Sequence, residues 1–307
     1  MPSWSEILES AKVSVNKTVD LNAIASRKTS AIKKLSEKTG RNVITYYSSF
    51  LQRPGSNINQ SINDSDMNAF MANVYKLDKT KGVDLILHTP GGAIGATEQI
   101  IFYLHEIFQD DVRAIIPQMS MSGGSIIAVS CKEIIMGKQS CLGPFDPQVS
   151  NIACQNMINE FETAVNDIDS RPASKEIWKV IFQKITPTFL AQCYQAISLT
   201  KELTDKILSK YNLTDEVKSN IMKCFLDNKD SKTHSRHLDI KKCEETGLNI
   251  VELESNPEIQ DLVLTIHHCY MILFQNTVID KIVENNNGAC FAVQTSLPKM
   301  PPAISTH

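Results

Sequence analysis

Two short glycine-rich segments hold the residues of this chain whose types and spacing best suit catalysis. In VDLILHTPGG (83–92) an apolar, strand-like run ends in two glycines, and in IPQMSMSGGSIIAVS (116–130) a second run breaks at Ser122, just before another glycine pair. Glycine allows positive φ and exposes backbone N–H groups, and the serine hydroxyl stands at a strand-to-helix corner. These are the parts of a nucleophile and an oxyanion hole.

The helix predicted after this serine gives the corner two alternative meanings. A helix that begins near Gly123 concentrates unpaired N–H groups and partial positive charge in its first turn, which favours a developing oxyanion. Alternatively, Ser122 is only the N-cap of that helix, because serine is among the residues preferred there. The Ser-Gly-Gly motif alone does not decide between them.

The order of the two motifs resembles that of a known superfamily. They stand about thirty residues apart and are joined by an amphipathic, helix-like stretch at 97–108. In the Clp/crotonase superfamily a PGG-type loop likewise faces a serine-bearing corner across a βαβ unit. More closely, the chain resembles the serine dehydrogenase proteinase family over about Val43 to Val293. The matching segments are DLILHTPGG (84–92), MSGGSIIA (121–128), LGPFDPQ (142–148), PTFLAQCYQAISLTKEL (187–203), THSRHLDIKKCEETGL (233–248) and HHCYM (267–271).

The resemblance implies a fold, an activity and an assembly. The expected fold class is α/β, with a Clp/crotonase-like spiral ββα core, a helical insertion and terminal helices. The expected activity is that of a serine peptidase, which cleaves a peptide or protein substrate through an acyl-enzyme on Ser122 and acts as a homo-oligomer. By analogy with the superfamily, Gly91, Gly92 and Gly123 form the oxyanion hole, with the N–H groups of Gly92 and Gly123 as donors.

Other functions use the same fold. A crotonase-type acyl-CoA enzyme would hold a thioester enolate with the same loops, but it would place an acid or amide side chain nearby and would not need Ser122. A non-catalytic assembly or scaffold subunit would keep the fold and lose the base. The name of the resembled family also records serine dehydrogenase activity, yet the glycines do not form a G-x-G-x-x-G fingerprint for a nicotinamide, and we expect no cofactor.

The general base is harder to assign than the nucleophile. Where a Clp-type subunit carries its histidine, this chain has Gly-Pro-Phe-Asp (143–146), and the next histidine after Ser122 is His234. We therefore expect a swapped triad, in which His237 or His234 takes the proton from the serine and Asp146 orients the imidazole. A triad is recognised by geometry and not by chain order, so this arrangement is chemically sound.

Two other candidates for the general base remain, His88 and a lysine. His88 ends the strand that leads into the glycine loop, so we expect it near the site, either as a base or as a hydrogen-bonded residue that shapes the loop. A Ser/Lys dyad, as in signal peptide peptidase A and its relatives, needs a lysine whose pKa is lowered by burial. Lys175, Lys179 and Lys184 follow the core, but their charged helical neighbours predict solvated side chains.

The remaining histidine patterns do not predict a metal site. HSRH (234–237) places histidines at i and i+3, yet no third ligand at zincin spacing accompanies them. His267 and His268 fall on a predicted helix, where consecutive side chains point about 100° apart. We expect one to face the core and the other an interface.

Composition excludes several classes of protein. The chain has 307 residues, 42% of them hydrophobic, and 31 basic and 34 acidic residues give a net charge of −3, which offers no electrostatic footprint for nucleic acid. Its eight cysteines never form a Cys-x-x-Cys pair, which favours reduced, buried thiols. The N-terminus lacks a signal-peptide pattern and no apolar run approaches a membrane span, so we expect a cytoplasmic protein with no membrane partner.

Hydrophobic periodicity predicts the elements that must position these residues. We divide the chain into an N-terminal helical segment, 1–40, and one Clp/crotonase-like domain, 41–307, with a helical insertion at about 152–228 that is interrupted at Pro172 and Pro187. We expect the helices of the first segment to face solvent or a partner. Strands are predicted at 42–48, 83–88, 112–117 and 133–136, and helices at 65–77, 97–108 and 123–130.

The last part of the chain is predicted to be mostly helical. After the insertion, a turn, a helix capped at Gly247 and a strand lead to a long terminal helix from about Pro257 to Glu284. Within the insertion, 187–203 carries an apolar stripe at helical spacing that must be buried against something, and we expect another subunit to cover it. The stripe comprises Phe189, Leu190, Cys193, Ala196, Ile197 and Leu203.

Overall fold

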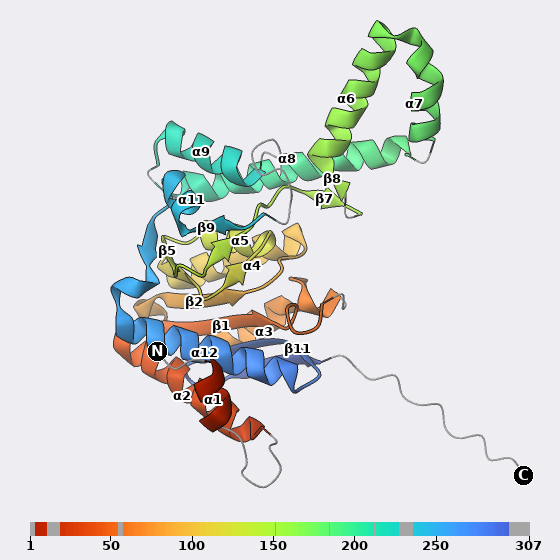
Figure 1. Ribbon diagram of the computed structural model, residues 1–307. Coiled ribbons are helices and arrows are strands. Elements are labelled where there is room, and N and C mark those ends of the chain that lie inside the picture. The colour runs from red at the N-terminus through yellow and green to blue at the C-terminus, as the bar shows by residue number, and fades with distance from the viewer. Residues whose placement is uncertain are drawn as a thin grey trace, which may run out of the picture.

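A seven-stranded, mostly parallel sheet lies at the centre of the chain (Figure 1). The computed structural model describes residues 4–10, 19–54, 58–150, 152–183, 185–211, 213–226 and 236–294. In sheet order, the strands are β10 (Ile250–Glu252), β5 (Glu133–Met136), β3 (Val112–Ile116), β2 (Val83–His88), β1 (Asn42–Ser48), β11 (Ile279–Asn285) and β12 (Cys290–Gln294). Neighbouring strands from β10 to β1 pair in parallel, and β11 and β12 pair antiparallel at the end of the sheet.

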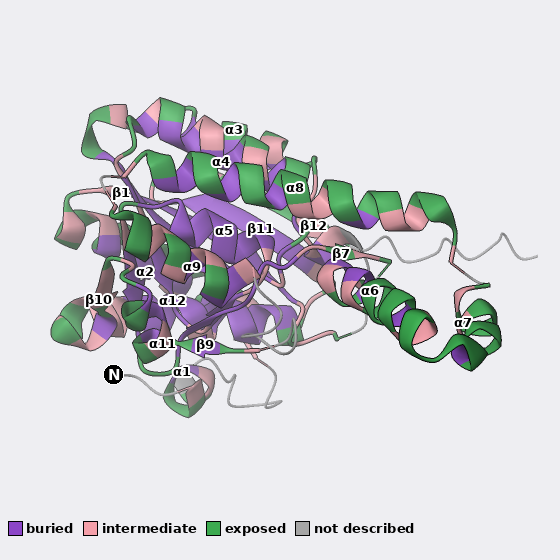
Figure 2. Cartoon of the chain, turned by 90° about the horizontal axis from the view of Figure 1, so that it is seen from above, coloured by how far each residue is buried: buried purple, intermediate pink, exposed green. Residues whose placement is uncertain are grey.

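Helices cover both faces of this sheet. α2 (Leu21–Thr39) and α12 (Pro257–Gln275) pack on one face. On the other lie α3 (Asp66–Val74), α4 (Ile94–Phe108) and α5 (Gly123–Val129), as Figures 1 and 2 show. Strands covered on both faces are buried throughout, and β1 and β2 are buried at every position. The structure is therefore mixed α/β, as predicted.

The predicted core strands and helices are confirmed, with ends that differ from the prediction by at most three residues. β1, β2 and β5 have the predicted bounds, and β3 ends one residue early. α4 begins at Ile94, three residues before its predicted start, so its first turn follows directly on the glycine loop. Continuous apolar runs bounded by glycine and proline are strong signals of buried strands, which explains the agreement.

The prediction that the helices before residue 40 face solvent or a partner is wrong for α2. Ile32 and Leu35 on this helix are buried against α12 and the sheet. Lys28, also buried, pairs with Glu284 of β11 at 2.8 Å. Lys28 is thus one of the polar residues that predict an outer helix, but Glu284 neutralises its charge inside the fold. The short α1 (Trp4–Ser10) packs on the same side.

The prediction of one terminal helix up to Glu284 is also wrong. α12 ends at Gln275, and residues 279–285 form β11, which pairs with β1 along its length. Charged residues hide the apolar pattern of this strand because each is buried with a partner. Lys281 lies 2.6 Å from Asp66, and Arg53 lies 2.6 Å from Asp280.

A second, three-stranded sheet stands beside the main one. It consists of β4 (Met119–Ser120), β6 (Cys141–Leu142) and β9 (Leu238–Asp239). β4 pairs with β6 in parallel, and β9 pairs with β6 antiparallel. Residues that follow β4, residues that follow β6 and residues that precede β9 therefore leave this sheet at the same end.

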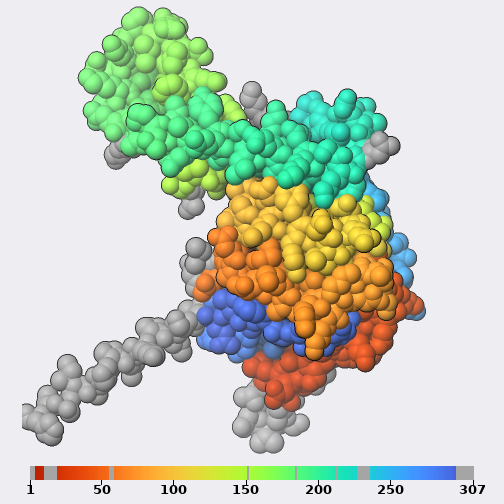
Figure 3. Space-filling view, turned by 180° about the vertical axis from the view of Figure 1, so that it is seen from behind, coloured from red at the N-terminus to blue at the C-terminus, as the bar shows by residue number. Residues whose placement is uncertain are grey.

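The segment predicted as a helical insertion does consist largely of helices. Its elements include a short hairpin, β7 (Gln148–Val149) and β8 (Ile152–Ala153), and then α6 (Cys154–Ser170), α7 (Lys175–Phe182), α8 (Pro187–Ser209) and α9 (Asp215–Leu226). α6, α7 and the first part of α8 project from the body, as Figures 1 and 3 show. In the described ranges no helix combines the length and the apolarity that crossing a lipid bilayer requires.

The apolar stripe of α8 is partly covered within the chain, by α6 and by the main core. Cys193 is fully buried against Cys154, Met157 and Ile158 of α6, and four other stripe residues, Phe189, Leu190, Ala196 and Ile197, pack half-buried around it. Leu203 is buried in the main core. The apolar side chains that remain exposed on the projection are Phe161, Val165, Ile177, Val180, Ile181, Tyr194 and Leu199.

Candidate active site

Ser122 occupies a strained corner between β4 and α5. Its backbone has φ +49° and ψ −120°, a region that non-glycine residues rarely adopt. Such conformations cost about 1–3 kcal/mol each and persist where the surroundings hold them. The serine side chain makes no capping hydrogen bond to α5. Helix capping, the structural alternative for this residue, is therefore not its role.

The glycine loop touches this corner backbone to backbone. Gly91 has φ +90°, and a Cβ placed on it would lie 2.5 Å from the carbonyl oxygen of Met121 and 2.6 Å from Cβ of Ser122. Real Cβ atoms do not approach so closely, so only glycine fits here. The N–H of Gly91 donates to Oγ1 of Thr89 at 3.1 Å, which fixes the turn.

The backbone N–H groups of Gly92 and Gly123 lie close to this corner. Gly92 bridges to Ile62, whose N–H donates to Gly91 O at 2.8 Å and whose carbonyl accepts from Ala93 N–H at 2.9 Å. Within the described part of the chain, no acceptor receives the N–H of Gly92 or of Gly123. The two groups are close together, because a Cβ on Gly123 would lie 3.4 Å from the nitrogen of Gly92.

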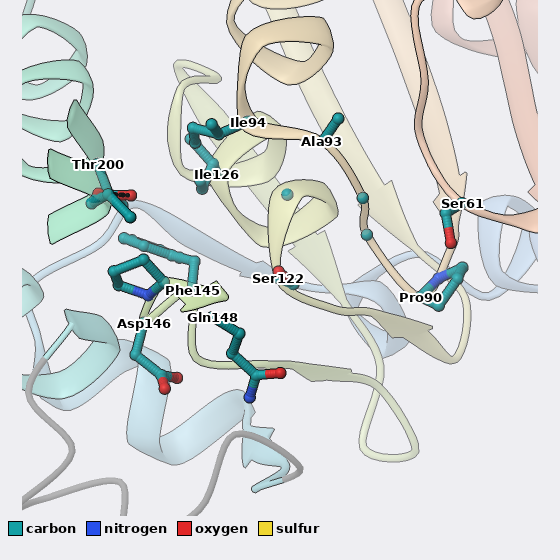
Figure 4. A pocket seen from close by; sticks show the side chains of 15 residues that line it. Ser61, Pro90, Ala93, Ile94, Ser122, Ile126, Phe145, Asp146, Gln148 and Thr200 are labelled. Atoms are coloured by element: carbon teal, nitrogen blue, oxygen red, sulfur yellow. Dashed lines mark hydrogen bonds between the residues drawn. The ribbon is translucent and has the colours of Figure 1, made fainter. Parts of the chain in front are cut away.

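A cavity of about 460 Å³ opens over these groups (Figure 4). Ser122 lies in its wall between the Pro90 loop and the segment that carries Asp146. Ala196 and Thr200 of α8 form a further wall, and Ser61 comes from the loop before α3. No sequence pattern singles out Ser61 or Thr200, and the apolar stripe that includes Ala196 does not place it at this site, since all three residues reach the cavity only through tertiary packing.

The segment that carries Asp146 is anchored on both sides. Oγ of Ser125, which is fully buried, donates to Ser120 O at 2.7 Å and accepts from Gly143 N–H at 2.9 Å, so α5 holds the start of the segment. Phe145 stacks on Phe225 of α9 with ring centroids 5.1 Å apart. Asp146 is 2% exposed and lines the Ser122 cavity.

His237 approaches the same region through the three-stranded sheet. Leu238, the residue after it, pairs with Leu142, which pairs in turn with Ser120. His237, Gly143 and Ser122 therefore leave the sheet at one end. His237 is exposed and does not line the cavity as described. His234, the alternative base, lies outside the described residues.

Comparison with known families agrees with this geometry. A family model described as the ClpP-like SDH-type serine proteinase matches residues 13–268. The chain belongs to this family. The match includes the glycine loop, the Ser122 corner, the Asp146 segment and β9, so it covers every element that builds the cavity.

Individual relatives of this ClpP-like protein match a smaller part of it. Two uncharacterized proteins of Methanocaldococcus jannaschii are similar to the chain. One is 33% identical over 131 residues, which is 40% of this chain and 44% of that protein. The other is 32% identical over 133 residues, 43% of this chain and 46% of that protein. The chain thus spans less than half the length of either relative that it matches.

His88 does not reach the cavity of this ClpP-like protein. Side chains alternate along β2, so Leu87 faces the α3–α5 layer, whereas His88 faces α12. Its ring packs fully buried between Phe50 and His267, with centroids 4.9 and 5.1 Å away. Burial lowers the pKa of His88 to about 3, so it is a poor base at neutral pH.

His267 and His268 differ in burial as predicted, although neither meets an interface that the structure shows. His267 is buried beside Tyr47 and His88, and burial lowers its pKa well below the ordinary value. His268 is half-buried and makes an edge contact with the ring of Trp4 in α1. The second histidine thus faces another helix of the same chain.

The lysines considered for a dyad do not lie near Ser122. Lys175 and Lys179 are exposed on α7, on the projection, and Lys184 lies outside the described residues. Lys28 and Lys281 are buried, but each pairs with a carboxylate. Burial lowers the pKa of Lys281, and the neighbouring Asp66 opposes that shift.

A second Ser-His-Asp grouping occurs at the far end of α5. His105 lies 2.8 Å from Asp110 through Nδ1 and 3.3 Å from Oγ of Ser130 through Nε2. The Ser130 hydroxyl is buried and donates to Ile127 O at the shorter distance of 2.7 Å. Burial lowers the pKa of His105, and the hydrogen bond that its ring donates to the carboxylate of Asp110 partly offsets this. This grouping joins α4 to α5 and does not open into the Ser122 cavity.

The buried histidines predict how stability depends on pH. His88 takes up a proton at about pH 3 when folded but near its ordinary pKa of about 6.5 when unfolded. Between these values the unfolded state binds more protons, so the free energy of unfolding falls as pH decreases from about 6.5, by up to about 1.4 kcal/mol per pH unit for this residue. We expect His88→Leu to flatten the profile of unfolding free energy against pH, measured by urea denaturation. Val278→Ala, an exposed substitution that removes no titrating group, is the control and should leave the slope unchanged. Parallel profiles for His88→Leu and the unmodified protein would contradict this account.

Proposed function

We propose that the protein is a serine peptidase that cleaves peptide bonds through an acyl-enzyme on Ser122. The observation that carries the proposal is the strained serine corner, whose hydroxyl stands in a cavity beside two N–H groups that the described chain leaves unengaged. Strained conformations of this kind cluster at catalytic sites. Family membership supports the same reaction class.

The reaction follows from the roles of these groups. A histidine takes the proton of the Ser122 hydroxyl as the oxygen attacks the substrate carbonyl, and the N–H groups of Gly92 and Gly123 donate to the resulting oxyanion. The histidine then returns the proton to the leaving amine. Water repeats the sequence on the acyl-enzyme and releases the acid. Removal of one oxyanion donor typically lowers the rate by about 10²–10³.

We assign the base to His237 or His234 and the orienting carboxylate to Asp146. Three features support this choice: Asp146 is buried in the cavity wall, β9 brings the second histidine segment to the end of the small sheet where Ser122 lies, and His88 and the described lysines point elsewhere. The chain order is then Ser, Asp, His, which triad geometry allows.

The finer architecture that we propose is the spiral of ββα units expected for a Clp/crotonase fold. Its support is the repeated order of elements, because α3, α4 and α5 each connect successive parallel strands of the main sheet and cross the same face. The short strands β4 and β6 turn aside from the main sheet between these units. The crotonase-type alternative is favoured by one observation, namely that Asp146 and Gln148 place an acid and an amide in the cavity. It leaves the strain at Ser122 unexplained.

Self-association is proposed for the projection formed by α6, α7 and the start of α8. Ile177 and Val180 are each 65% exposed on α7, so an apolar face remains although the α8 stripe is partly covered. Clp-type subunits assemble through a helical handle at the corresponding place. A second copy of the chain is the occupant that this resemblance favours.

Removal of the Ser122 hydroxyl tests the assignment of the nucleophile. Ser122→Ala should abolish labelling by a fluorophosphonate probe and lower kcat/KM for peptide hydrolysis by about 10⁴–10⁶, because the attacking oxygen is gone. Ser130→Ala, at the second Ser-His-Asp grouping, is the matched control and should keep both. Mass spectrometry of the labelled protein identifies the modified residue. Retained hydrolysis in purified Ser122→Ala, or a label on Ser130, would refute the assignment.

The second prediction separates the bases. One of the two variants His237→Ala and His234→Ala should lose about 10⁴ in kcat, while the other and His88→Leu keep activity within about tenfold. Added imidazole should partly restore the inactive variant, since a small base can enter the open cavity. Asp146→Asn should lower kcat without preventing substrate binding. Full activity in both alanine variants would exclude the swapped triad.

The third prediction concerns assembly. A stable interface buries about 800 Å² per partner, so the unmodified protein should remain oligomeric at about 1 µM. The double variant Ile177→Glu/Val180→Glu should dissociate it, whereas Tyr75→Glu, at a residue 76% exposed on the body, should not. Light scattering after size-exclusion chromatography measures the mass. A monomeric unmodified protein would contradict the proposal.

A further inference from the structure

A second cavity adjoins the Ser122 cavity on the far side of Pro147. It has a volume of about 350 Å³ and lies between α8 and α9, with Ile197, Met222 and Leu226 in its wall. Pro147 lines both cavities. We call this second space the α8–α9 cavity.

The two cavities lie against adjacent faces of α8. Ala196 and Thr200 face the Ser122 cavity, and the residue after each of them, Ile197 and Lys201, faces the α8–α9 cavity. Successive residues of a helix point about 100° apart, so adjacent faces of one helix serve the two spaces. Because Pro147 lines both spaces, a peptide bound along the Ser122 cavity has the second cavity within reach of a neighbouring side chain.

Two lysines border this apolar space. Lys201 of α8 and Lys223 of α9 line it, together with the uncharged Gln155, and among the residues that the structure describes no acidic side chain does. Both lysines are exposed, and neither takes part in an ion pair within the described part of the chain. In a chain of net charge −3, such a pair creates a local positive field.

The positive charge continues beyond the α8–α9 cavity. Lys223 also lines a third cavity, of about 460 Å³, with Arg236 and Lys242. Glu245 is the acidic residue in this wall, and it lies 2.9 Å from Lys242. Lys223 is therefore shared by the α8–α9 cavity and this third cavity.

We propose that the α8–α9 cavity is a specificity site that takes an apolar side chain of a substrate peptide with an acidic residue beside it. This inference rests on the proposed peptidase function, since it names the substrate class of the same site. The apolar wall supplies the contact for the side chain, and Lys201 and Lys223 select the sign of the neighbouring charge.

Binding tests the proposal without requiring catalysis. The probe is a set of fluorescent peptides of equal length, each with a central Leu flanked by Glu, Gln or Lys, titrated against the full chain carrying Ser122→Ala. We expect the Glu-flanked peptide to bind about tenfold more tightly than the Lys-flanked one at low salt, and the ratio to shrink as salt screens the charges. Anisotropy measures each Kd.

Variants of the cavity wall test whether Lys201 and Lys223 cause the charge preference. Lys201→Glu/Lys223→Glu should reverse the preference, and Met222→Trp should weaken binding of every Leu peptide by filling the cavity. Lys218→Glu on α9, which lines none of the three cavities, is the control and should keep the preference for Glu. The proposal is overturned if the unmodified cavity shows no charge preference, or if the double variant keeps the original one.

A different set of results is expected if the proposed peptidase function itself is wrong. In that case Ser122 resists the fluorophosphonate probe and no peptide is hydrolysed, while the anisotropy experiment still reports whether the cavity selects acidic, apolar peptides. If peptides are hydrolysed at Ser122 with equal kcat/KM for Glu and Lys flanks, the specificity site alone is wrong.

Discussion

The close contact between the glycine loop and the backbone of the Ser122 corner is the constraint on which the rest of the site depends. Gly91 packs against Met121 and Ser122 so closely that a single added carbon would meet the backbone carbonyl at 2.5 Å. This contact accompanies the positive φ of Ser122 and brings the nitrogens of Gly92 and Gly123 close to the corner. Both segments begin where parallel strands end, so the sheet sets their separation, and hydrogen bonds from Ile62 hold the glycine loop on its outer side.

Buried charges carry this support to the edge of the sheet. Lys281 of β11 donates to Ser61 O at 2.8 Å and to Asp66 at 2.6 Å, and Asp66 also accepts from the hydroxyl of Tyr46 at 2.8 Å. The residue after Ser61 is the one that bridges to Gly92. A buried ion pair contributes little net stability in general, but loss of one partner typically costs about 3–5 kcal/mol. Its position here favours a role in fixing the loop that braces the glycine turn.

The sequence predicts what is encoded locally and fails where tertiary packing decides. Strands β1, β2 and β5 follow from short apolar runs with clear boundaries, and the Ser122 corner follows from glycines whose conformational freedom has few other uses. β11 does not follow from the sequence, because its charged residues are paired only in the fold. Burial of the α8 stripe does follow from its apolar spacing, but α6 and the main core supply part of the cover, and no local pattern distinguishes a helix of the same chain from a second subunit. The walls supplied by Ser61 and Thr200 could not be predicted for the same reason.

The insertion explains both the chain order of the proposed triad and the shape of the substrate path. Ser122 and the glycine loop come from consecutive strand–helix units, so they are near each other in sequence as well as in space. Asp146 follows β6, and the chain then makes α6 to α9 before β9 returns to pair with β6. Of the helices that separate the carboxylate from the histidine segment in sequence, α8 walls the cavity, and Phe225 of α9 stacks on Phe145, which also lines it. A change in this insertion should therefore alter which peptides enter while the serine corner, built from the core alone, keeps its geometry.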